Sequence, residues 1–438
     1  MDDDTSLPRY IRPALQPLGL YFRVGRNDHT TLTPLLAHGQ RSYYGVVVDA
    51  ARVQRHRELL KEAERARLEC ILDPCTQASA TIGGYGEKLG NLPWGLDRPH
   101  RIEDFEITSS ADAVSMLADF VVENRFSQTM APTHYIKGAE DRWLNVDVNS
   151  VHRLRDRLDQ AGGKQIGIIY SLCLPYGVFR DEAHRERIIG ALDGLPVQSL
   201  WLRVDGCGAD SSPTALRNYI AACRDFSSLE LPIVADQIGG LTGLSLLALS
   251  ATGGLATGLA VGERFDARHW HRQQYGRAYM AHPRVYLPTL DVSLDPKEAR
   301  ALFEHNVRLK GLVGCKDPDC CARGVVDMIE APARHFAVQR IKQVAALGRD
   351  PESLRPGLFV ERFVRPTTDH ALQLSKATGL DDVLRKRFAR HRHRLDALRL
   401  MLGKLIELDQ AALHARIPKT RAMREGSTAA GYSVRGQP

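Results

Sequence analysis

The chain lacks the long apolar runs and the dense cysteines that mark membrane and secreted proteins. Its longest apolar candidate, 241–261, is diluted by glycine, serine and threonine, whereas a membrane helix needs about 20 apolar residues. The first ten residues, MDDDTSLPRY, are acidic and do not resemble a secretory signal. Eight cysteines in 438 residues are too few for a disulfide scaffold. We therefore expect a soluble protein of the cytoplasm.

Several catalytic motifs are also missing. The sequence contains neither a Walker-A loop nor a clean G-x-G-x-x-G after a strand, which argues against nucleotide hydrolysis and a Rossmann domain. Three histidines cluster at His269, His271 and His282, but no H-x-H lies on an early strand. The absence of H-x-H counts against a metal-dependent amidohydrolase.

What the chain does contain is a series of seven short apolar runs, each ending in a polar residue. Continuous runs of this length are typical of parallel strands buried on both faces, and helix-like stretches separate most of them. The pattern predicts a (β/α)8 TIM-like barrel. A run at 18–24 is a possible extra strand, and 131–136 is expected to fill the eighth place. The seven runs are Gly45–Asp49, 70–73, 166–171, 200–205, 231–236, 255–263 and 285–291.

The remaining sequence divides into smaller units after the barrel. A cysteine-rich element is followed by a helix, then by a stretch with several prolines, then by a basic helix and a polar tail. The predicted domains are a barrel (1–310), a cysteine-rich element and helix (311–348), a linker (349–380), a heptad-patterned basic helix (381–413) and a disordered tail (414–438).

Carboxylates at the ends of the predicted strands form the first candidate site. In a barrel of this kind, the residues at the strand C-termini build the active site. A carboxylate there can act as base, acid or covalent nucleophile. The alternative is that individual carboxylates pair with arginine or cap a helix. We select Asp73, Asp205 and Asp236 as catalytic from the set Asp49, Asp73, Asp205, Asp236, Glu263 and Asp291.

Polar and glycine-rich segments follow these strands and are candidates for substrate binding. Glycine lets backbone N–H groups approach a ligand closely, although tight turns explain single pairs equally well. The residues expected to bind substrate are Gln77, Gly84, Tyr85, Gln237, Gly262 and Glu263.

The segment Cys315-Lys-Asp-Pro-Asp-Cys320-Cys321 is a candidate metal site, with His335 fourteen residues later. Three cysteines this close in a chain without a disulfide scaffold are typical of a structural zinc site. The adjacent pair can bind one tetrahedral ion only if the backbone turns sharply there. Buried free thiols or a redox pair remain alternatives.

The C-terminal part carries the excess positive charge. Residues 381–438 hold 13 Lys/Arg and 6 Asp/Glu, so 13 − 6 = +7, which equals the net charge of the whole chain. A nucleic-acid partner would explain this asymmetry, as would a solvated tail. We expect Arg385, Arg392 and Arg399 to contact phosphate. The apolar steps of four and three residues predict a helix that packs on the barrel, a second subunit or a partner protein. Its seam is Leu384, Phe388, His391, Leu395, Leu398, Leu402 and Leu405.

One segment resembles a known family. GGLATGLAVGE at 253–263 is similar to the G-G-L-A-V-G-E segment of the tRNA-guanine transglycosylase superfamily, and PRVYL at 283–287 is similar to its P-R-Y-L. The family also has a zinc element after its barrel. The resemblance implies that an Asp nucleophile displaces guanine from DNA or RNA and that a modified, 7-deazaguanine-type base replaces it. The target base must be everted from its stack.

The sequence departs from the family at two motifs. The family has D-S-G-G-Y-Q where this chain has TIGGYG (81–86), and its D-C-V and P-T-R nucleophile segment has no counterpart. Two other interpretations therefore stay open. One is a non-catalytic barrel that binds nucleic acid or mediates assembly, and the other is a barrel lyase or hydrolase acting on a small molecule.

Overall fold

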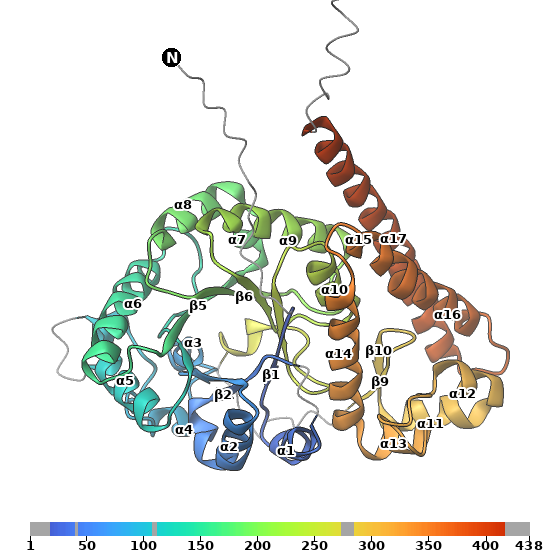
Figure 1. Ribbon diagram of the computed structural model, residues 1–438, viewed down its shortest axis with the longest axis horizontal. Helices are drawn as coiled ribbons and strands as arrows, with labels where there is room; N and C mark the ends of the chain where they lie inside the picture. Colours follow the sequence, from blue (N-terminus) through green and yellow to red (C-terminus); the bar gives the residue numbers. More distant parts are fainter. Residues whose placement is uncertain (1–17, 40–42, 107–111, 273–283, 417–438) are drawn as a thin grey trace, which may run out of the picture.

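Eight parallel strands close into a barrel with helices around it, so the chain is a TIM barrel (Figure 1). The computed structural model describes residues 18–39, 43–106, 112–272 and 284–416. The strands follow one another around the barrel in sequence order, and β1 pairs with β8 to close it. They are β1 Gly19–Arg23, β2 Gly45–Asp49, β3 Glu69–Asp73, β4 Gln128–Met130, β5 Gly167–Pro175, β6 Ser199–Asp205, β7 Ile233–Asp236 and β8 Gly254–Thr257.

Six of the seven predicted runs contain barrel strands, which confirms them. The prediction for the seventh run is wrong. The run at 285–291 contains β9 (Val285–Leu287), which pairs antiparallel with β10 (Val292–Leu294) outside the barrel. The run at 18–24 supplies β1 instead. The remaining barrel strand is predicted at 131–136, but the structure places it earlier, as β4, which ends at Met130. Burial explains the error, since Val285 and Leu287 are as buried as barrel residues.

The barrel interior begins with one apolar layer to which every strand contributes one side chain. Side chains alternate between the two faces of a strand, so the residue two positions later points inward again. On five strands that next inward position is charged: Arg23, Asp49, Asp73, Arg203 and Asp236. A charged layer therefore lies on the apolar one, toward the strand C-termini. The apolar layer is Tyr21, Val47, Ile71, Met130, Ile169, Trp201, Val234 and Ala256.

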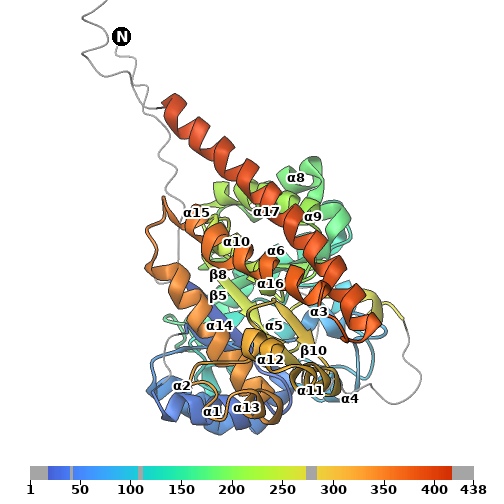
Figure 2. The same cartoon turned by 90° about the vertical axis from the view of Figure 1, so that its right-hand side faces the viewer.

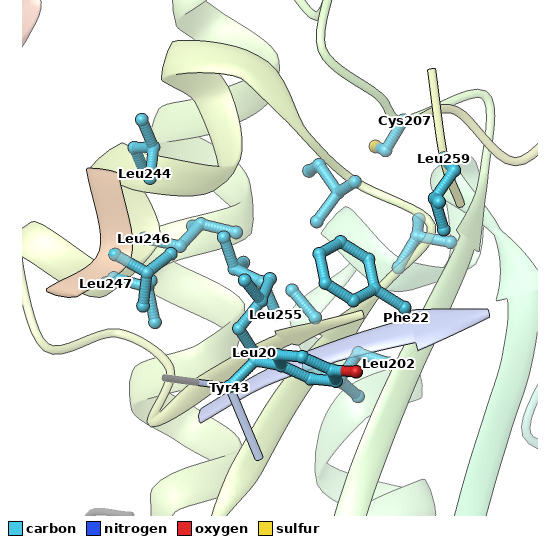
Figure 3. Close-up of a cluster of buried hydrophobic side chains, with 14 of the residues drawn as sticks. Leu20, Phe22, Tyr43, Leu202, Cys207, Leu244, Leu246, Leu247, Leu255 and Leu259 are labelled. Atoms are coloured by element: carbon cyan, nitrogen blue, oxygen red, sulfur yellow. The ribbon is translucent and has the colours of Figure 1, made fainter. Parts of the chain in front are cut away.

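The outward faces of the strands pack against the surrounding helices. Figure 3 shows Leu20 and Phe22 of β1 beside Leu244 and Leu247 from the neighbouring helix α10. Helix α9 begins as the sequence predicts, with Pro213 at its first position and Ser212 capping the N–H of Ala215. The helices around the strands are α1 His29–Ala37, η1 Ala50–His56, α2 Arg57–Arg65, α3 Thr76–Ser79, α4 Glu87–Gly90, α5 Ala113–Glu123, α6 Arg142–Gln160, α7 Tyr176–Arg180, α8 Glu182–Leu192, α9 Pro213–Phe226 and α10 Gly240–Ala248.

A helical unit follows the barrel and packs against it (Figure 2). Helix α14 contacts β1, β9 and α10, so it lies over the barrel wall. The long helix α17 runs across α9 and α16. The helices of this unit are α11 Pro296–His305, α12 Val307–Val313, α13 Val325–Glu330, α14 Pro332–Arg349, α15 Arg355–Phe359, α16 Arg365–Ser375 and α17 Asp382–Arg416, with a π-helical turn at Val360–Val364.

The predicted linker at 349–380 is wrong, because α15, the π-helical turn and α16 occupy most of it. Pro356 and Pro366 lie in the first turn of α15 and α16, where proline starts a helix rather than breaking it. The predicted helix at 381–413 corresponds to α17. The predicted disordered tail overlaps the last residues of α17 and otherwise lies outside the described residues. Within the described ranges, the search for an apolar helix of membrane-spanning length finds none.

Candidate functional site: a charged layer at the mouth of the barrel

Two aspartates and two arginines of the charged layer form one ion-pair network. Arg23 donates from Nε and Nη2 to the two oxygens of Asp236 at 2.5 and 2.7 Å, and from Nη1 to Asp73 Oδ2 at 2.8 Å. Arg203 donates from Nε to Asp236 Oδ2 at 2.8 Å and from Nη2 to Asp73 Oδ2 at 3.0 Å. Each arginine therefore bridges both carboxylates. The predicted residues Asp73 and Asp236 lie at the same end of the barrel and converge.

The network is almost closed to solvent. Asp73 is 7% exposed and Asp236 is 2% exposed. Burial alone would raise the pKa of the Asp73 carboxyl, but Arg203 and Arg23 outweigh burial and hold this pKa well below its usual value. The carboxylate of Asp73 is therefore ionised at neutral pH. Both aspartates are locked in place by charge-assisted hydrogen bonds.

A predicted substrate-binding residue, Gln77, extends this network. Its Oε1 accepts a hydrogen bond from Arg203 Nη1 at 2.5 Å. Its Nε2 donates to Thr133 Oγ1 at 3.0 Å and to the Ser171 carbonyl oxygen at 2.9 Å. Gln77 is only 4% exposed. The contacts of Gln77 orient Arg203, and its amide is fully used by protein groups.

Asp49 belongs to the same layer but is not held by the two bridging arginines. It lies beside Asp73 in the register of β2 and β3 and pairs with Arg52 at 3.0 Å. Burial, opposed by Arg52 and assisted by Asp73, raises the pKa of the Asp49 carboxyl. Nearby, Cys75 has a left-handed backbone, with φ 61°, and its N–H donates to Asp73 Oδ1 at 2.9 Å. Such a conformation is costly outside glycine and is common at functional sites.

The third predicted catalytic residue, Asp205, lies one layer nearer the solvent. It follows Arg203 by two positions on β6 and is half-buried. Its Oδ2 accepts a hydrogen bond from the Tyr135 hydroxyl at 3.2 Å, and its Oδ1 accepts from the N–H of Ala267 at 2.8 Å. The ring of His271 packs edge-on against Tyr135 at 4.8 Å. Neither bridging arginine forms an ion pair with Asp205, and Asp205 is partly exposed.

Among the described residues, no contact joins the other predicted substrate-binding residues to this network. The Tyr85 hydroxyl donates to the Leu96 carbonyl oxygen at 2.9 Å, and the Gly84 N–H donates to Thr81 within the same loop. Gln237 follows Asp236 directly, in a left-handed conformation with φ 58°. Gly262 also has positive φ, at 78°.

Glu263 takes part in a second network, between the barrel and α14. Its Oε1 accepts hydrogen bonds from the Gly240 N–H at 3.0 Å and from Arg340 Nη2 at 2.6 Å. Arg340 is 1% exposed and lies over the rings of Tyr286 and Phe336. Asp291 accepts from the Leu241 N–H at 2.7 Å in the same region. The contacts of Glu263 therefore attach α14 to the start of α10.

The side chains of Cys315, Cys320, Cys321 and His335 form a cluster that could hold a metal ion. Their candidate ligand atoms all lie within 4.8 Å of one another. His335 Nδ1 is 3.3 Å from the sulfur of both Cys320 and Cys321, and these two sulfurs are 3.7 Å apart. The necessary sharp turn is present, since the N–H groups of Cys320 and Cys321 both donate to the Asp317 carbonyl oxygen.

The hydrogen bond at the other ring nitrogen supports this assignment. His335 Nε2 lies 2.9 Å from the carbonyl oxygen of Tyr286. If Nε2 carries the proton and donates to that oxygen, the Nδ1 lone pair faces the three sulfurs. Metal-bound histidines commonly have such a partner. The donor set of three sulfurs and one nitrogen suits a tetrahedral ion, for which neighbouring thiolate sulfurs are about 3.8 Å apart.

The arginines proposed to bind nucleic acid lie on α17. Arg385 pairs with Asp382 at 2.5 Å and Arg392 with Asp396 at 3.2 Å, while Arg399 is exposed. Two other arginines of this helix face the protein instead. Arg387 donates to the Ser293 carbonyl oxygen at 2.9 Å, and Arg394 donates to the Ala209 carbonyl oxygen at 2.9 Å.

Sequence reasoning missed Arg23 and Arg203. The signal was present, because Arg23 ends the otherwise apolar strand GLYFR, and Arg203 is the one charged residue before the terminal Asp205 of SLWLRVD. Their inward direction follows from alternation with Tyr21 and Trp201, which lie in the apolar layer. An arginine that points into a barrel needs a carboxylate partner, which predicts the ion pairs.

Comparison with known proteins identifies no family for this chain. No family model matches the chain, and no curated protein matches it. Among solved structures, thiamine phosphate pyrophosphorylase from Pyrococcus furiosus is 12% identical with a TM-score of 0.28, covering 58% of this chain and 92% of that one. The carboxyl transferase domain of Rhizobium etli pyruvate carboxylase is 11% identical with a TM-score of 0.36, covering 88% and 61%. The 3-dehydroquinate dehydratase from Aquifex aeolicus VF5 is 12% identical with a TM-score of 0.30, covering 57% and 93%. Likenesses this weak carry no information about activity.

Proposed function

We propose that the protein is a barrel enzyme that exchanges a guanine base in a nucleic acid for a modified, 7-deazaguanine-type base, with Asp205 as the nucleophile. The observation that carries this proposal is the difference among the three strand-end aspartates. Asp73 and Asp236 are buried and paired with two arginines each, whereas Asp205 is half-buried and forms no ion pair with an arginine among the described residues. A nucleophile must be able to touch its substrate.

The contacts of Asp205 suit this role. The Tyr135 hydroxyl and the Ala267 N–H hold the carboxylate in one orientation. In the first step, an Asp205 oxygen forms a bond to the anomeric carbon of guanosine while the bond from that carbon to the base nitrogen breaks. The electron pair stays on the base, which takes up a proton from solvent. In the second step, the incoming base attacks the same carbon and loses a proton to solvent, and the bond between that carbon and the Asp205 oxygen breaks.

The buried network lies in the layer of the barrel next to Asp205. Arg203 lies two residues before Asp205 on β6, and its guanidinium is fixed by Asp73, Asp236 and Gln77. Because Asp73 and Asp236 neutralise the two arginines, this four-residue network carries no net charge. We assign Asp73 and Asp236 a positioning role, since their oxygens are occupied.

Two further elements fit the proposal. The segment at 253–263 and the Cys/His cluster resemble the transglycosylase superfamily, and we assign zinc to that cluster as a structural ion. Arg385, Arg392 and Arg399 are proposed contacts to the phosphate backbone, because α17 carries them in the most basic part of the chain. Of these three, Arg399 has no ion pair within the described ranges.

The test is incorporation of labelled guanine into mixed tRNA and, separately, into double-stranded DNA. The wild-type chain should incorporate label into one of the two, and Asp205→Asn should reduce incorporation at least a thousandfold because the covalent step is lost. Asp210→Asn is the matched control, since Asp210 lies in the loop that follows β6 and pairs with Arg264. Retention of exchange by Asp205→Asn would contradict the assignment.

A non-catalytic barrel that binds nucleic acid is the second candidate. It is favoured by the fact that two of the three aspartates are saturated by arginine. This candidate predicts that the wild-type chain binds nucleic acid but incorporates no label into either polymer. The same experiment therefore separates the two functions.

A further inference from the structure

A cavity of about 770 Å³ lies beside the ends of β2 and β3, and Asp205 is not among the residues that line it. Helix η1, the segment after β3, α4 and α5 surround it. Asp49 and Cys75 mark its boundary with the charged layer. Its size is within the range of about 300–1,000 Å³ that is usual for small-molecule sites.

The polar part of the lining is strongly cationic. Arg26, Arg52, Arg55 and Lys88 line the cavity, and Asp49 is the one carboxylate among its lining residues. Asp49 is already paired with Arg52. In the part of the chain that the structure describes, no ion pair is formed by Arg26, Arg55 or Lys88, so three cations have no internal counter-charge.

One of these cations is held in place by neutral groups. Arg55 donates from Nε to the Arg26 carbonyl oxygen at 2.7 Å and from Nη2 to Asn27 Oδ1 at 2.8 Å. These bonds fix the guanidinium without neutralising it. A positioned arginine with free donors is suited to a phosphate, because its planar fork matches phosphate oxygens.

The rest of the lining is apolar. Ala78, Leu89, Leu92 and Phe120 form part of the wall. A cavity with an apolar wall and a cationic side suits a ligand with a flat hydrophobic body and an anionic group.

We propose that this cavity binds an organic phosphate, with the phosphate on Arg26, Arg55 and Lys88 and the ring system on the apolar wall. The phosphate assignment rests on the cavity alone. Naming the ligand as a guanine nucleotide, free or within a polynucleotide, rests on the proposed function.

The experiment is calorimetric titration of the full chain with GMP and with guanosine. GMP should bind at least tenfold more tightly than guanosine, since guanosine lacks the phosphate. The variant Arg26→Gln, Arg55→Gln, Lys88→Gln should weaken GMP binding at least tenfold and flatten its salt dependence. These side chains are exposed, so the substitutions leave the core unchanged.

A second triple variant controls for the loss of three positive charges. Arg300, Arg308 and Lys310 are exposed on α11 and α12 and do not line the cavity. Their replacement by Gln should change GMP affinity by less than twofold. Absence of GMP binding by the wild-type chain, equal affinity for GMP and guanosine, or equal effects of the two triple variants would overturn the proposal.

Two further measurements identify the source of the phosphate and separate this proposal from the proposed function. If a single-stranded oligonucleotide displaces GMP, the site accepts a polynucleotide phosphate; if it does not, the ligand is a free phosphate ester. A chain that binds GMP as described but exchanges no base would refute the proposed function and leave the cavity assignment standing.

Discussion

At the scale of single residues, Arg23 and Arg203 inside the barrel determine which strand-end carboxylates are paired. A buried charge is costly unless it is paired and hydrogen-bonded. The network meets this requirement with two positive and two negative groups, each carboxylate touching both guanidiniums. Removing one member leaves its partners charged and buried.

We predict that Arg203→Met destabilises the fold by about 3–5 kcal/mol, because Asp73, Asp236 and Gln77 lose a common partner. Urea unfolding followed by circular dichroism measures the change. Arg217→Met is the control, since Arg217 is exposed on α9. Its expected effect is within about 0.5 kcal/mol. A loss of stability for Arg203→Met no larger than for the control would show that the network is dispensable.

The sequence predicts where the aspartates of this site lie, but not which groups they pair with. Asp73 and Asp236 could be placed at one rim, because parallel strands bring their C-termini together. The difference between them and Asp205 could not be read from strand ends alone. It depends on register: Leu202 of β6 pairs with Ala235 of β7, so Arg203 lies level with Asp236, and Asp205 lies one layer beyond the end of β7.

At the scale of elements, the heptad pattern of α17 marks the face of the helix that packs against the rest of the protein. Leu384, Phe388, Leu395 and Leu398 are buried, and the helix packs along α16 and across α9. His391 also lies in this seam, where Nε2 is 2.6 Å from the Leu290 carbonyl oxygen. His391 is half-buried, and this hydrogen bond joins α17 to the turn between β9 and β10.

His391 should make the docking of α17 sensitive to acid. Burial, together with Arg394 and Arg387, lowers its pKa to about 4, whereas an unfolded histidine titrates near about 6.5. Between these values the unfolded state binds a proton that the folded state does not, so stability falls as the pH decreases from about 6.5 to about 4.

We predict that His391→Gln, which keeps a hydrogen-bond donor but does not titrate, reduces this loss of stability by up to about 3 kcal/mol. The measurement is urea unfolding at pH 7 and pH 4.5. His393→Gln is the matched control, because His393 is exposed on the same helix. Equal pH dependence in the wild-type chain and His391→Gln would show that another group causes the acid sensitivity.

On the scale of the whole molecule, the barrel and the C-terminal helices are joined by polar as well as apolar contacts. Arg340 of α14 pairs with Glu263 after β8, and α14 packs on β1. The sequence predicts the barrel because its strands are apolar on both faces. It does not predict the β9–β10 hairpin, whose apolar residues are buried by helices and resemble barrel strands in composition.

The Cys/His cluster connects three segments of this C-terminal unit. Cys315, Cys320 and Cys321 come from the turn after α12, His335 comes from α14, and its Nε2 contacts the carbonyl oxygen of Tyr286 on β9. A metal ion would hold these segments together in addition to the apolar contacts around them. Because the ion binds only the folded arrangement, its binding free energy adds to stability.

We predict one zinc ion per chain, which elemental analysis of the purified protein would detect. Cys320→Ser should abolish metal binding and lower Tm by about 5 °C or more, since each lost kcal/mol lowers Tm by about 2–4 °C in domains of 150–250 residues. Chelation of the wild-type chain should lower Tm similarly and have no further effect on the variant. Cys70→Ser removes a thiol of β3 far from the cluster and should leave the metal content unchanged. A metal-free native chain in which all eight thiols react would identify the cluster as free cysteines.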